Sequence, residues 1–555
     1  MELFDYFTLG ICLFGISAFG FYKSRKKAEE EQSAHATMVG SGVSVWSVTL
    51  SVCSGFISSI SLLGFPAEVY FQGGMMLWFI PMYFISFPIV AYVFLPVLYN
   101  LKLTTIYEYF ERRFNYSCRI VTTSLFCVQM ILYNSVALYA PSLAIATITQ
   151  IPIALSILIT STLSAVYISI GGAKAGIYTS ALQMALIFLT LSFMITISLQ
   201  QTSISQVYQD IVAGNRLILD DFRLTPTIRH SVWSLVIGGT GNILSLFAAN
   251  QLSIQRYMAL DSLGKAQRVV LLNIICNTLI LLCYVFVGFI IYSHYKDCHP
   301  QLKNSNELLP QFVMDVISSY KGSVGLFAAA VYSAGISTLS ASFTAVSSIV
   351  INDILKIYRN HKNQPPLTQK QIENAMRILP LILAFFSVFI AFLCSQMQSI
   401  ILQVSFIVFG AGGGPVLGSF IVGFFMPKVK GHAALTGLIS SIIICFSISI
   451  GSVILKVKPI TLELGSQCIE NNSSVINMSK NQFYDESLIG QVTSTQLDYD
   501  IDRIFAVSYQ YYSVIAVLSN VAVSYITQKC MDVLSKTNEN AKVEIELISP
   551  LLRNA

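Results

Sequence analysis

The chain has 555 residues, of which 54% are hydrophobic and only 11% are charged, and its formal net charge is +5. A soluble globular protein carries about 25% charged residues. The composition therefore excludes an ordinary soluble domain and predicts an all-α, polytopic membrane protein. The small positive charge reflects where basic residues lie relative to a membrane and gives no argument for nucleic-acid binding.

Long apolar segments recur along the chain, each close to the roughly 20 residues that a helix needs to cross a bilayer. Thirteen are predicted, with approximate limits 5–22, 43–68, 76–100, 118–142, 151–170, 176–199, 229–254, 268–292, 323–352, 375–395, 399–425, 432–455 and 508–527. If the N-terminus is outside, most of the 33 lysine and arginine residues lie on the cytoplasmic side. The positive-inside rule therefore predicts an external N-terminus and a cytoplasmic C-terminus.

Two of these segments contain small residues that would interrupt a helix. The segment 43–68 holds Gly55 among several serines, and the segment 229–254 holds GGTGN at 238–242. Each opens a set of five helices, and the two sets run in opposite orientations. The pattern predicts a five-plus-five inverted repeat, in which interrupted helices mark the binding site. Glycine kinks that serve packing alone are the alternative.

A later segment carries many hydroxyl side chains in an otherwise apolar helix. Five of them share one face: Ser333, Ser337, Ser340, Thr344 and Ser347. Small residues of this kind let membrane helices pack closely. Buried oxygens can also line the path of an ion. The stripe alone leaves both readings open.

Only two of the eleven cysteines, Cys298 and Cys468, fall in predicted external loops. An oxidising compartment would allow a disulfide between them. The sequence has no P-loop for ATP, no His/Cys cluster with metal-site spacing and no pairing of a nucleophile with a base. It therefore predicts neither an enzyme nor an ATP-driven pump.

Six segments, in a fixed order from about residue 5 to residue 530, resemble the sodium/solute symporters. They are LLGFPAEVYFQGG (62–74), YISIGGAKAGIYTSALQ (167–183), RHSVWSLVIGGT (229–240), NQLSIQRYMA (250–259), YSAGISTLSASFTAVSS (332–348) and GGGPVLGSFIVGFFMP (412–427). The chain looks most like the animal branch that carries iodide, monocarboxylates and vitamins such as biotin and pantothenate. The resemblance implies the inverted-repeat (LeuT-like) fold and transport driven by the inward sodium gradient.

The resemblance also implies a sodium site where the interrupted helix 43–68 meets the hydroxyl stripe. Its ligands would be carbonyl and hydroxyl oxygens of Ser54, Ile57, Ala334, Ser337 and Thr338. Neutral oxygens suit a hard monovalent cation and release it readily.

A substrate site in the middle of the membrane is implied as well. The matching residues are Phe56, Ser61, Phe79, Tyr83, Trp233, Ser405 and Phe406. A pocket of aromatic rings with a few hydroxyls would suit a small, partly apolar solute with one polar head. No lysine or arginine is expected at this depth, so an anion would rely on helix N-termini, hydroxyls and the nearby sodium.

Two positions depart from the family pattern. Ser180 stands where the family usually has Asp, which leaves stoichiometry and gating open. Ser61 stands where iodide and vitamin carriers commonly have Gln, which argues against transferring a substrate by analogy. Arg256, in the motif NQLSIQRYMA, is expected to be a structural anchor on the cytoplasmic side.

The leading interpretation is a plasma-membrane symporter that imports a small organic anion or vitamin-like solute with Na⁺ by alternating access and uses no organic cofactor. A non-transporting sensor of the same fold and a sodium-independent solute transporter are the alternatives. The expected divisions are a first helix and loop (1–42), two inverted repeats (43–199 and 200–427), two additional helices with an external loop (428–530) and a cytoplasmic tail (531–555).

We expect the external loop 456–507 to carry N-linked glycan, because it contains sequons at Asn471, Asn472 and Asn477. Glycosidase treatment of protein from native membranes should increase its mobility on a gel, and replacing all three asparagines with glutamine should abolish that shift. An unchanged band in the untreated and treated wild-type protein would contradict both the glycan and the external position of the loop.

Overall fold

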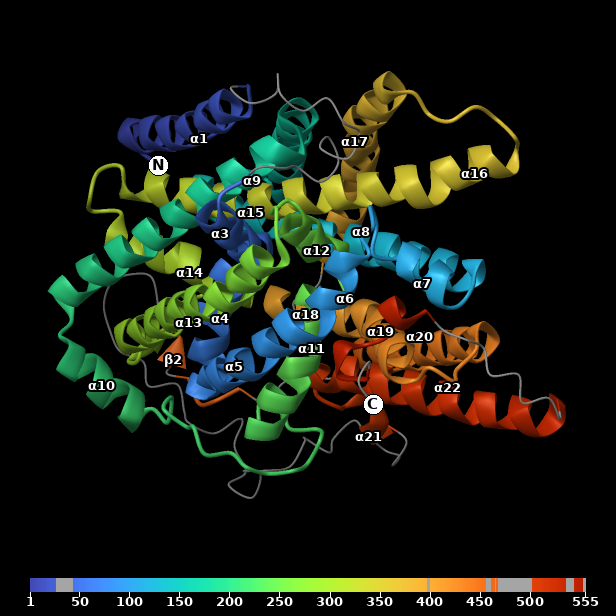
Figure 1. Ribbon diagram of the computed structural model, residues 1–555. Helices are drawn as coiled ribbons and strands as arrows, with labels where there is room; N and C mark the ends of the chain where they lie inside the picture. Colours follow the sequence, from blue (N-terminus) through green and yellow to red (C-terminus); the bar gives the residue numbers. More distant parts are fainter. Residues whose placement is uncertain are drawn as a thin grey trace.

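The computed structural model is a bundle of long helices (Figure 1), and it describes residues 1–25, 43–396, 400–455, 461–464, 466–467, 502–535 and 544–552. The helices are α1 (Leu3–Arg25), α3 (Val45–Phe56), α4 (Ser59–Gln72), α5 (Phe79–Ile89), α6 (Leu95–Asn100), α7 (Glu108–Arg113), α8 (Tyr116–Thr149), α9 (Ile153–Gln201), α10 (Ile204–Ala213), α11 (Gly239–Phe247), α12 (Gln251–Met258), α13 (Leu263–His294), α14 (Leu308–Phe312), α15 (Ser323–Ile349), α16 (Lys356–His361), α17 (Gln369–Cys394), α18 (Ile401–Val408), α19 (Gly414–Phe425), α20 (Gly431–Ile454), α21 (Asp502–Phe505) and α22 (Tyr512–Ser535). The strands β1 (Cys298–His299) and β2 (Ser466–Gln467) form a small parallel pair.

Several of these helices are joined into longer ones by π-helical turns. The turns lie at Val90–Phe94, Ser234–Gly238, Val313–Ile317, Val350–Leu355 and Phe409–Gly413. As a result, α5 continues into α6, α15 into α16 and α18 into α19, which gives apolar segments of 27, 39 and 25 residues. Each is long enough to cross a bilayer.

The described helices account for all thirteen predicted segments. Nine are long and apolar enough to span a membrane, and two further spans each consist of a pair of helices bent at a short break. The remaining two predictions correspond to the shorter apolar segments Leu3–Phe19 and Ile153–Ser164. The boundary predicted between 170 and 176 is wrong for the backbone, because α9 runs through it as one helix of 49 residues. The range 153–201 contains no proline that would stop a helix.

Helix starts follow the usual capping chemistry. Asn115 begins α8 by accepting a hydrogen bond from the Cys118 amide at 2.9 Å. At the start of α17, Thr368 and Gln371 form a reciprocal capping box. These side chains satisfy amide groups that have no partner inside the helix, so the long helices begin where the sequence provides a cap.

The first predicted interruption is confirmed, slightly beyond the glycine. The helix α3 ends before Ile57 and Ser58, and α4 then departs at 59°. Ile57 has φ −80° and ψ 83°, outside the helical region, and Ser58 restarts the helix by accepting from the Ile60 amide at 3.2 Å. Gly55 itself remains helical. The sequence therefore breaks this span by a serine cap that begins a second helix.

The second interruption lies elsewhere than predicted. The break between α11 and α12 falls at residues 248–250, with a bend of 54°, and not at 238–242. Asn250 caps α12 by accepting from the Leu252 amide at 2.9 Å, and the Ser253 hydroxyl donates to the freed Leu246 carbonyl at 2.9 Å. The glycines of GGTGN serve close packing instead: a Cβ on Gly238 would lie 2.6 Å from the carbonyl oxygen of Gln510.

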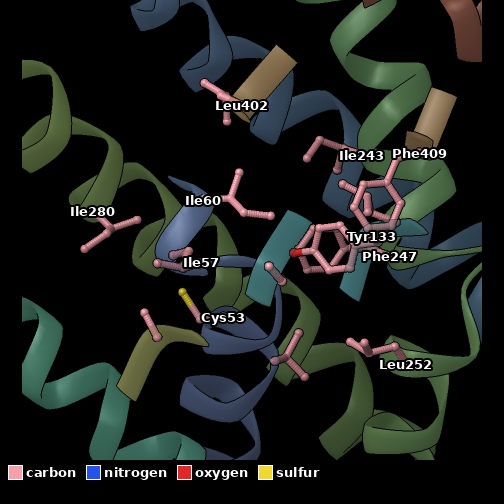
Figure 2. Packing of buried hydrophobic residues seen from close by; sticks show 14 of the residues in the cluster. Cys53, Ile57, Ile60, Tyr133, Ile243, Phe247, Leu252, Ile280, Leu402 and Phe409 are labelled. Carbon is pink, nitrogen blue, oxygen red and sulfur yellow. The ribbon is translucent and has the colours of Figure 1, made fainter. Parts of the chain in front are cut away.

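The apolar core lies around these two breaks. Figure 2 shows Cys53, Ile57 and Ile60 along the first broken span, and Tyr133, Phe247, Leu252 and Phe409 nearby. The rings of Tyr133 and Phe409 are 4.5 Å apart. The helices α3, α4, α8, α11 and α12 and the π-helical turn before α19 therefore meet where two of the spans are irregular, and they shield the broken backbone from lipid.

Glycines at intervals of four residues form a close seam between α19 and α22. A Cβ on Gly414 or Gly418 would lie 2.7 Å or 2.8 Å from the Cβ atoms of Ala516 and Asn520, respectively. Gly410, one turn earlier, meets Tyr512 in the same way. We call this contact the glycine seam. The two helices approach so closely because these positions have no side chain.

The pair β1–β2 brings together two segments that are distant in sequence. Cys298 of β1 is opposite Ser466 of β2, and Cys298 is disulfide-bonded. The nine other cysteines that the structure describes are free. The predicted partner, Cys468, lies outside the described residues, as do the sequons at Asn471, Asn472 and Asn477.

At the end of the bundle that carries α7 and α16, opposite α10 (Figure 1), a buried carboxylate joins several helices. Asp353 is fully buried and forms an ion pair with Arg119 of α8. The hydroxyl of Thr105 lies 2.7 and 3.0 Å from its two oxygens, and that of Thr123 lies 3.1 Å away. A buried charge is tolerated only with such a complete set of partners.

Asp353→Ala should strongly destabilise the protein, because it leaves the Arg119 charge in the interior without its carboxylate. Removing one member of a buried pair costs about 3–5 kcal/mol. Thermal unfolding of the detergent-solubilised protein should show a clear drop in Tm. The matched control is Asp261→Ala, which breaks the exposed ion pair with Lys265 and should change stability by less than about 1 kcal/mol. Equal effects of the two substitutions would contradict this assignment.

Candidate functional site

Oxygen atoms from two helices converge beside the break of the first span. The Ser337 hydroxyl of α15 lies 3.1 Å from the carbonyl oxygen of Ser54, near the end of α3, and 2.9 Å from that of Ala334. The Thr338 hydroxyl donates to the same Ala334 carbonyl at 3.1 Å. Four of the five residues predicted to hold sodium are therefore together. We call this group the oxygen cluster.

The fifth predicted residue, Ile57, lies at the break itself. Its backbone angles take its carbonyl out of the helical repeat, although no described contact joins it to α15. Ser54 contributes through its carbonyl, since its hydroxyl is used within α3, where it donates to the Ser51 carbonyl at 3.1 Å. All of these residues are at least nine-tenths buried. Neutral carbonyl and hydroxyl oxygens in a buried position fit a sodium ion.

The hydroxyls of the stripe on α15 have different surroundings. Thr344 donates only within its own helix, to the Ser340 carbonyl at 2.7 Å. Gly335 packs on Pro141, where an added Cβ would lie 3.0 Å from the ring. By contrast, the Ser333 and Ser347 hydroxyls are buried and make no hydrogen bond to any described residue. The packing reading is supported at Gly335, and the reading of the stripe as part of an ion path stays a prediction.

Three predicted substrate residues form one aromatic cluster. The ring centroid of Phe79 lies 6.3 Å from that of Tyr83 and 5.9 Å from that of Phe406. Phe65 of α4 contacts Phe79 at 6.1 Å and stacks on Tyr284 at 5.6 Å. The cluster therefore connects α4, the second half of the first broken span, and α13 with α5 and α18.

The other predicted substrate residues have different positions. Ser61 and Ser405 are each 8% exposed. Trp233 is 37% exposed, and its indole nitrogen donates to the Phe222 carbonyl at 2.9 Å. The expectation that Trp233 shares the aromatic cluster is not supported by any contact between it and those rings. The side chain of Phe56 lies outside the described residues.

A buried charged network adjoins the aromatic cluster, and the sequence reasoning did not identify it. Arg229 binds both carboxylate oxygens of Glu68, at 2.7 and 3.0 Å, and donates to Gln403 at 2.7 Å. His230 lies 3.3 Å from the same carboxylate and 2.9 Å from the Tyr509 hydroxyl. We call this group the Glu68 network. It joins α4, the segment before α11, α18 and the segment before α22.

The Glu68 network reaches the predicted substrate residues through Tyr509. Its ring lies 5.0 Å from the Arg229 guanidinium and stacks on Phe406 at 5.9 Å. A signal was present in the sequence, because Glu68 falls within an apolar segment and Arg229 begins another. Opposite charges inside predicted spans are functional candidates by default.

Two further positions singled out in the sequence are buried. Ser180, which replaces the family Asp, is 1% exposed on α9. Arg256, which was expected to be a structural anchor on the cytoplasmic side, is 6% exposed and packs against α3 at Gly55. The break between α11 and α12 directs α12 into the bundle, which explains why this arginine is buried.

Comparisons with known proteins agree with this geometry. The model of the sodium:solute symporter family matches residues 38–441. Sodium-coupled monocarboxylate transporter 1 of Mus musculus is 31% identical over 535 residues, which cover 94% of this chain and 86% of that protein. The putative sodium-dependent multivitamin transporter of Drosophila melanogaster is 30% identical over 454 residues, which cover 80% and 75% of the two chains.

The fold has a counterpart among solved structures. A Na⁺-coupled sialic acid symporter matches with a TM-score of 0.74 at 21% identity, covering 95% of this chain and 98% of that one. This likeness concerns the arrangement of helices, and it confirms the LeuT-like architecture that the two breaks indicated. The relatives are transporters, and the chain is likewise a multi-pass membrane transporter and not an enzyme. The family model, the extent of both relatives and the shared fold together show that this chain belongs to the sodium:solute symporter family.

Proposed function

We propose that the protein is a sodium-coupled symporter that imports a small organic monoanion, such as a monocarboxylate or a vitamin-like carboxylate, by alternating access. The observation that carries the proposal is the oxygen cluster, where Ser337 and Thr338 of α15 meet the end of α3. It offers neutral oxygens at a break in the helix, and family membership makes sodium the ion that such a site would take.

The solute would bind among the aromatic rings beside this site. Phe79, Tyr83 and Phe406 present apolar surface, and the hydroxyls of Ser61 and Ser405 are close in sequence to the helix break and to Phe406. This composition suits an apolar body with one polar head. The names of the relatives support monocarboxylates and vitamins as the classes to test first.

The chain organisation follows the same proposal. We assign 43–199 and 200–427 to the two inverted repeats, with residues 1–42 before them and 428–530 and 531–555 after them. The N-terminus would be external, the C-terminus cytoplasmic and the protein resident in the plasma membrane. The disulfide of Cys298 would be formed with Cys468, because β1 pairs with the two residues that precede Cys468 by one and two positions.

Uptake measurements test this function directly. Cells that express the full chain should accumulate one or more labelled solutes from a panel of pyruvate, lactate, biotin and pantothenate, with iodide and glucose as further candidates. Accumulation should require external sodium and should fall to background with choline. Equal uptake in sodium and in choline would indicate a sodium-independent transporter. A membrane current without solute uptake would indicate a sensor. Either result contradicts the proposal.

Thr338→Ala should raise the sodium concentration needed for half-maximal transport several-fold. Losing one hydroxyl ligand costs on the order of 1 kcal/mol. Thr344→Ala is the matched control, since Thr344 lies on the same helix six residues beyond Thr338, and its hydroxyl donates to the carbonyl four residues before it in the same way. Sodium dependence should be measured on protein shown to reach the cell surface. An unchanged value for Thr338→Ala, or an equal change in the control, would remove Thr338 from the site.

A further inference from the structure

Arg256 is a buried cation without a counter-charge among the described residues. Its side chain lies on α12, directly after the second helix break, and the residue is 6% exposed. Its Nη1 atom is buried and makes no hydrogen bond to any residue that the structure describes. Burying an unpaired charge is among the most costly arrangements in a membrane protein, and such groups are usually functional.

Four other arginines with largely buried side chains, among the residues that the structure describes, have carboxylate or carbonyl partners. Arg229 pairs with Glu68 and Arg119 pairs with Asp353. Arg113 and Arg216 each donate to three backbone carbonyls. Arg256 differs because its free nitrogen is directed at the backbone of a neighbouring broken helix.

The guanidinium occupies space that a side chain would otherwise fill. A Cβ on Gly55 would lie 1.9 Å from Arg256 Nη1 and 3.2 Å from the Leu252 side chain. Glycine at this position therefore lets the cation approach the end of α3. Ser51 lies one turn earlier on the same face of α3, and its hydroxyl is also buried without a hydrogen-bond partner among the described residues. A cation and a hydroxyl donor thus adjoin on two packed helices, both with bonding capacity left.

This pair lies next to the proposed ion site. Gly55 directly follows Ser54, whose carbonyl meets the Ser337 hydroxyl. Sodium at the oxygen cluster and the charge of Arg256 would therefore repel each other across the end of one helix. An anion at Arg256 would cancel that repulsion.

We propose that Arg256, with Ser51, binds a small monovalent anion, which we assign as the carboxylate of the transported solute on its way past the helix breaks. This assignment rests on the proposed symport function. It makes Arg256 the residue through which anion and sodium binding depend on each other: with no anion its charge weakens sodium binding, and a bound carboxylate restores it. Such reciprocal dependence is a coupling free energy between two sites.

The test measures sodium binding by the purified full chain in detergent, with radioactive sodium and no membrane gradient. L-Lactate and its neutral analogue lactamide are the probes, and methanesulfonate replaces chloride in the buffer. In the wild-type protein, L-lactate should strengthen sodium binding several-fold and lactamide should not. In Arg256→Gln, sodium binding without lactate should be several-fold tighter than in the wild type, and the strengthening by lactate should be several-fold smaller. Arg268→Gln, which removes an exposed arginine at the start of α13, is the matched control and should behave as the wild type.

The outcomes separate this inference from the function on which it rests. If the wild-type protein binds sodium and responds to lactate, but Arg256→Gln responds equally, the anion site is wrong and the symporter proposal stands. If the wild-type protein transports none of the panel with sodium, the symporter proposal itself fails. If chloride alone reproduces the lactate effect in the wild type and blocks any further effect of lactate, the occupant is chloride, which overturns the assignment to the solute.

Two more variants keep the test informative if Arg256→Gln does not fold. Arg256→Lys keeps the charge and should retain a reduced lactate effect. Gly55→Ala keeps the arginine but forces its guanidinium away from α3, because the added methyl group would collide with Nη1. It should therefore weaken the lactate effect on sodium binding. A full lactate effect in Gly55→Ala would contradict the proposed position of the anion.

Discussion

The need to satisfy backbone groups inside a membrane governs this structure. A carbonyl that leaves its helix at bilayer depth must find a donor or an ion, because lipid offers neither. The end of α3 meets that need with the Ser337 hydroxyl from α15, and α12 meets it with Ser253, which donates to a carbonyl freed at the second break. Where the partner is a hydroxyl, the carbonyl can be shared with a passing cation. The proposed ion site and the solution to a folding problem would thus use the same set of atoms.

Two buried carboxylates organise opposite parts of this arrangement. Glu68 holds Arg229 next to α4, the second half of the first broken span, and Asp353 holds Arg119 where α15 continues toward α16. Each joins segments that are distant in sequence, and each is surrounded by further hydrogen bonds. Charged pairs of this quality fix a geometry more than they add stability, because their desolvation offsets much of their attraction. The irregular centre therefore lies between two well-specified polar contacts.

Much of this could be predicted from the sequence. The membrane class, the thirteen apolar segments, the first helix break and the meeting of Ser54 with Ser337 all follow from hydropathy, small polar residues and family motifs. The second break could not be placed, because GGTGN reads the same whether glycine opens a helix or admits a neighbour; the cap at Asn250 decided it. Trp233 shows a similar limit, since a motif gives a residue's position along the helix but not the neighbour to which its side chain bonds.

The positions of Glu68, Arg229 and Arg256 show why charges are hardest to interpret from one sequence. Each falls near the end of an apolar segment, where a long side chain can reach water or fold back into protein. Only the path of the neighbouring backbone distinguishes the two. Arg256 is buried because α12 turns inward after the break, and that turn involves residues several positions before it.

The glycine seam between α19 and α22 has a mechanical consequence. Because its contacts repeat every four residues, α22 cannot slide along α19 by a fraction of a turn without driving Ala516 or Asn520 into a helix backbone. The side chains of α22 fit against the glycines of α19 and hold the two helices in register. A change of conformation that moves α19, which is part of the eleventh predicted span, would therefore move α22, the last predicted span, together with it. Gly437, where an added Cβ would lie 2.0 Å from the Ser524 hydroxyl, extends the same engagement to α20.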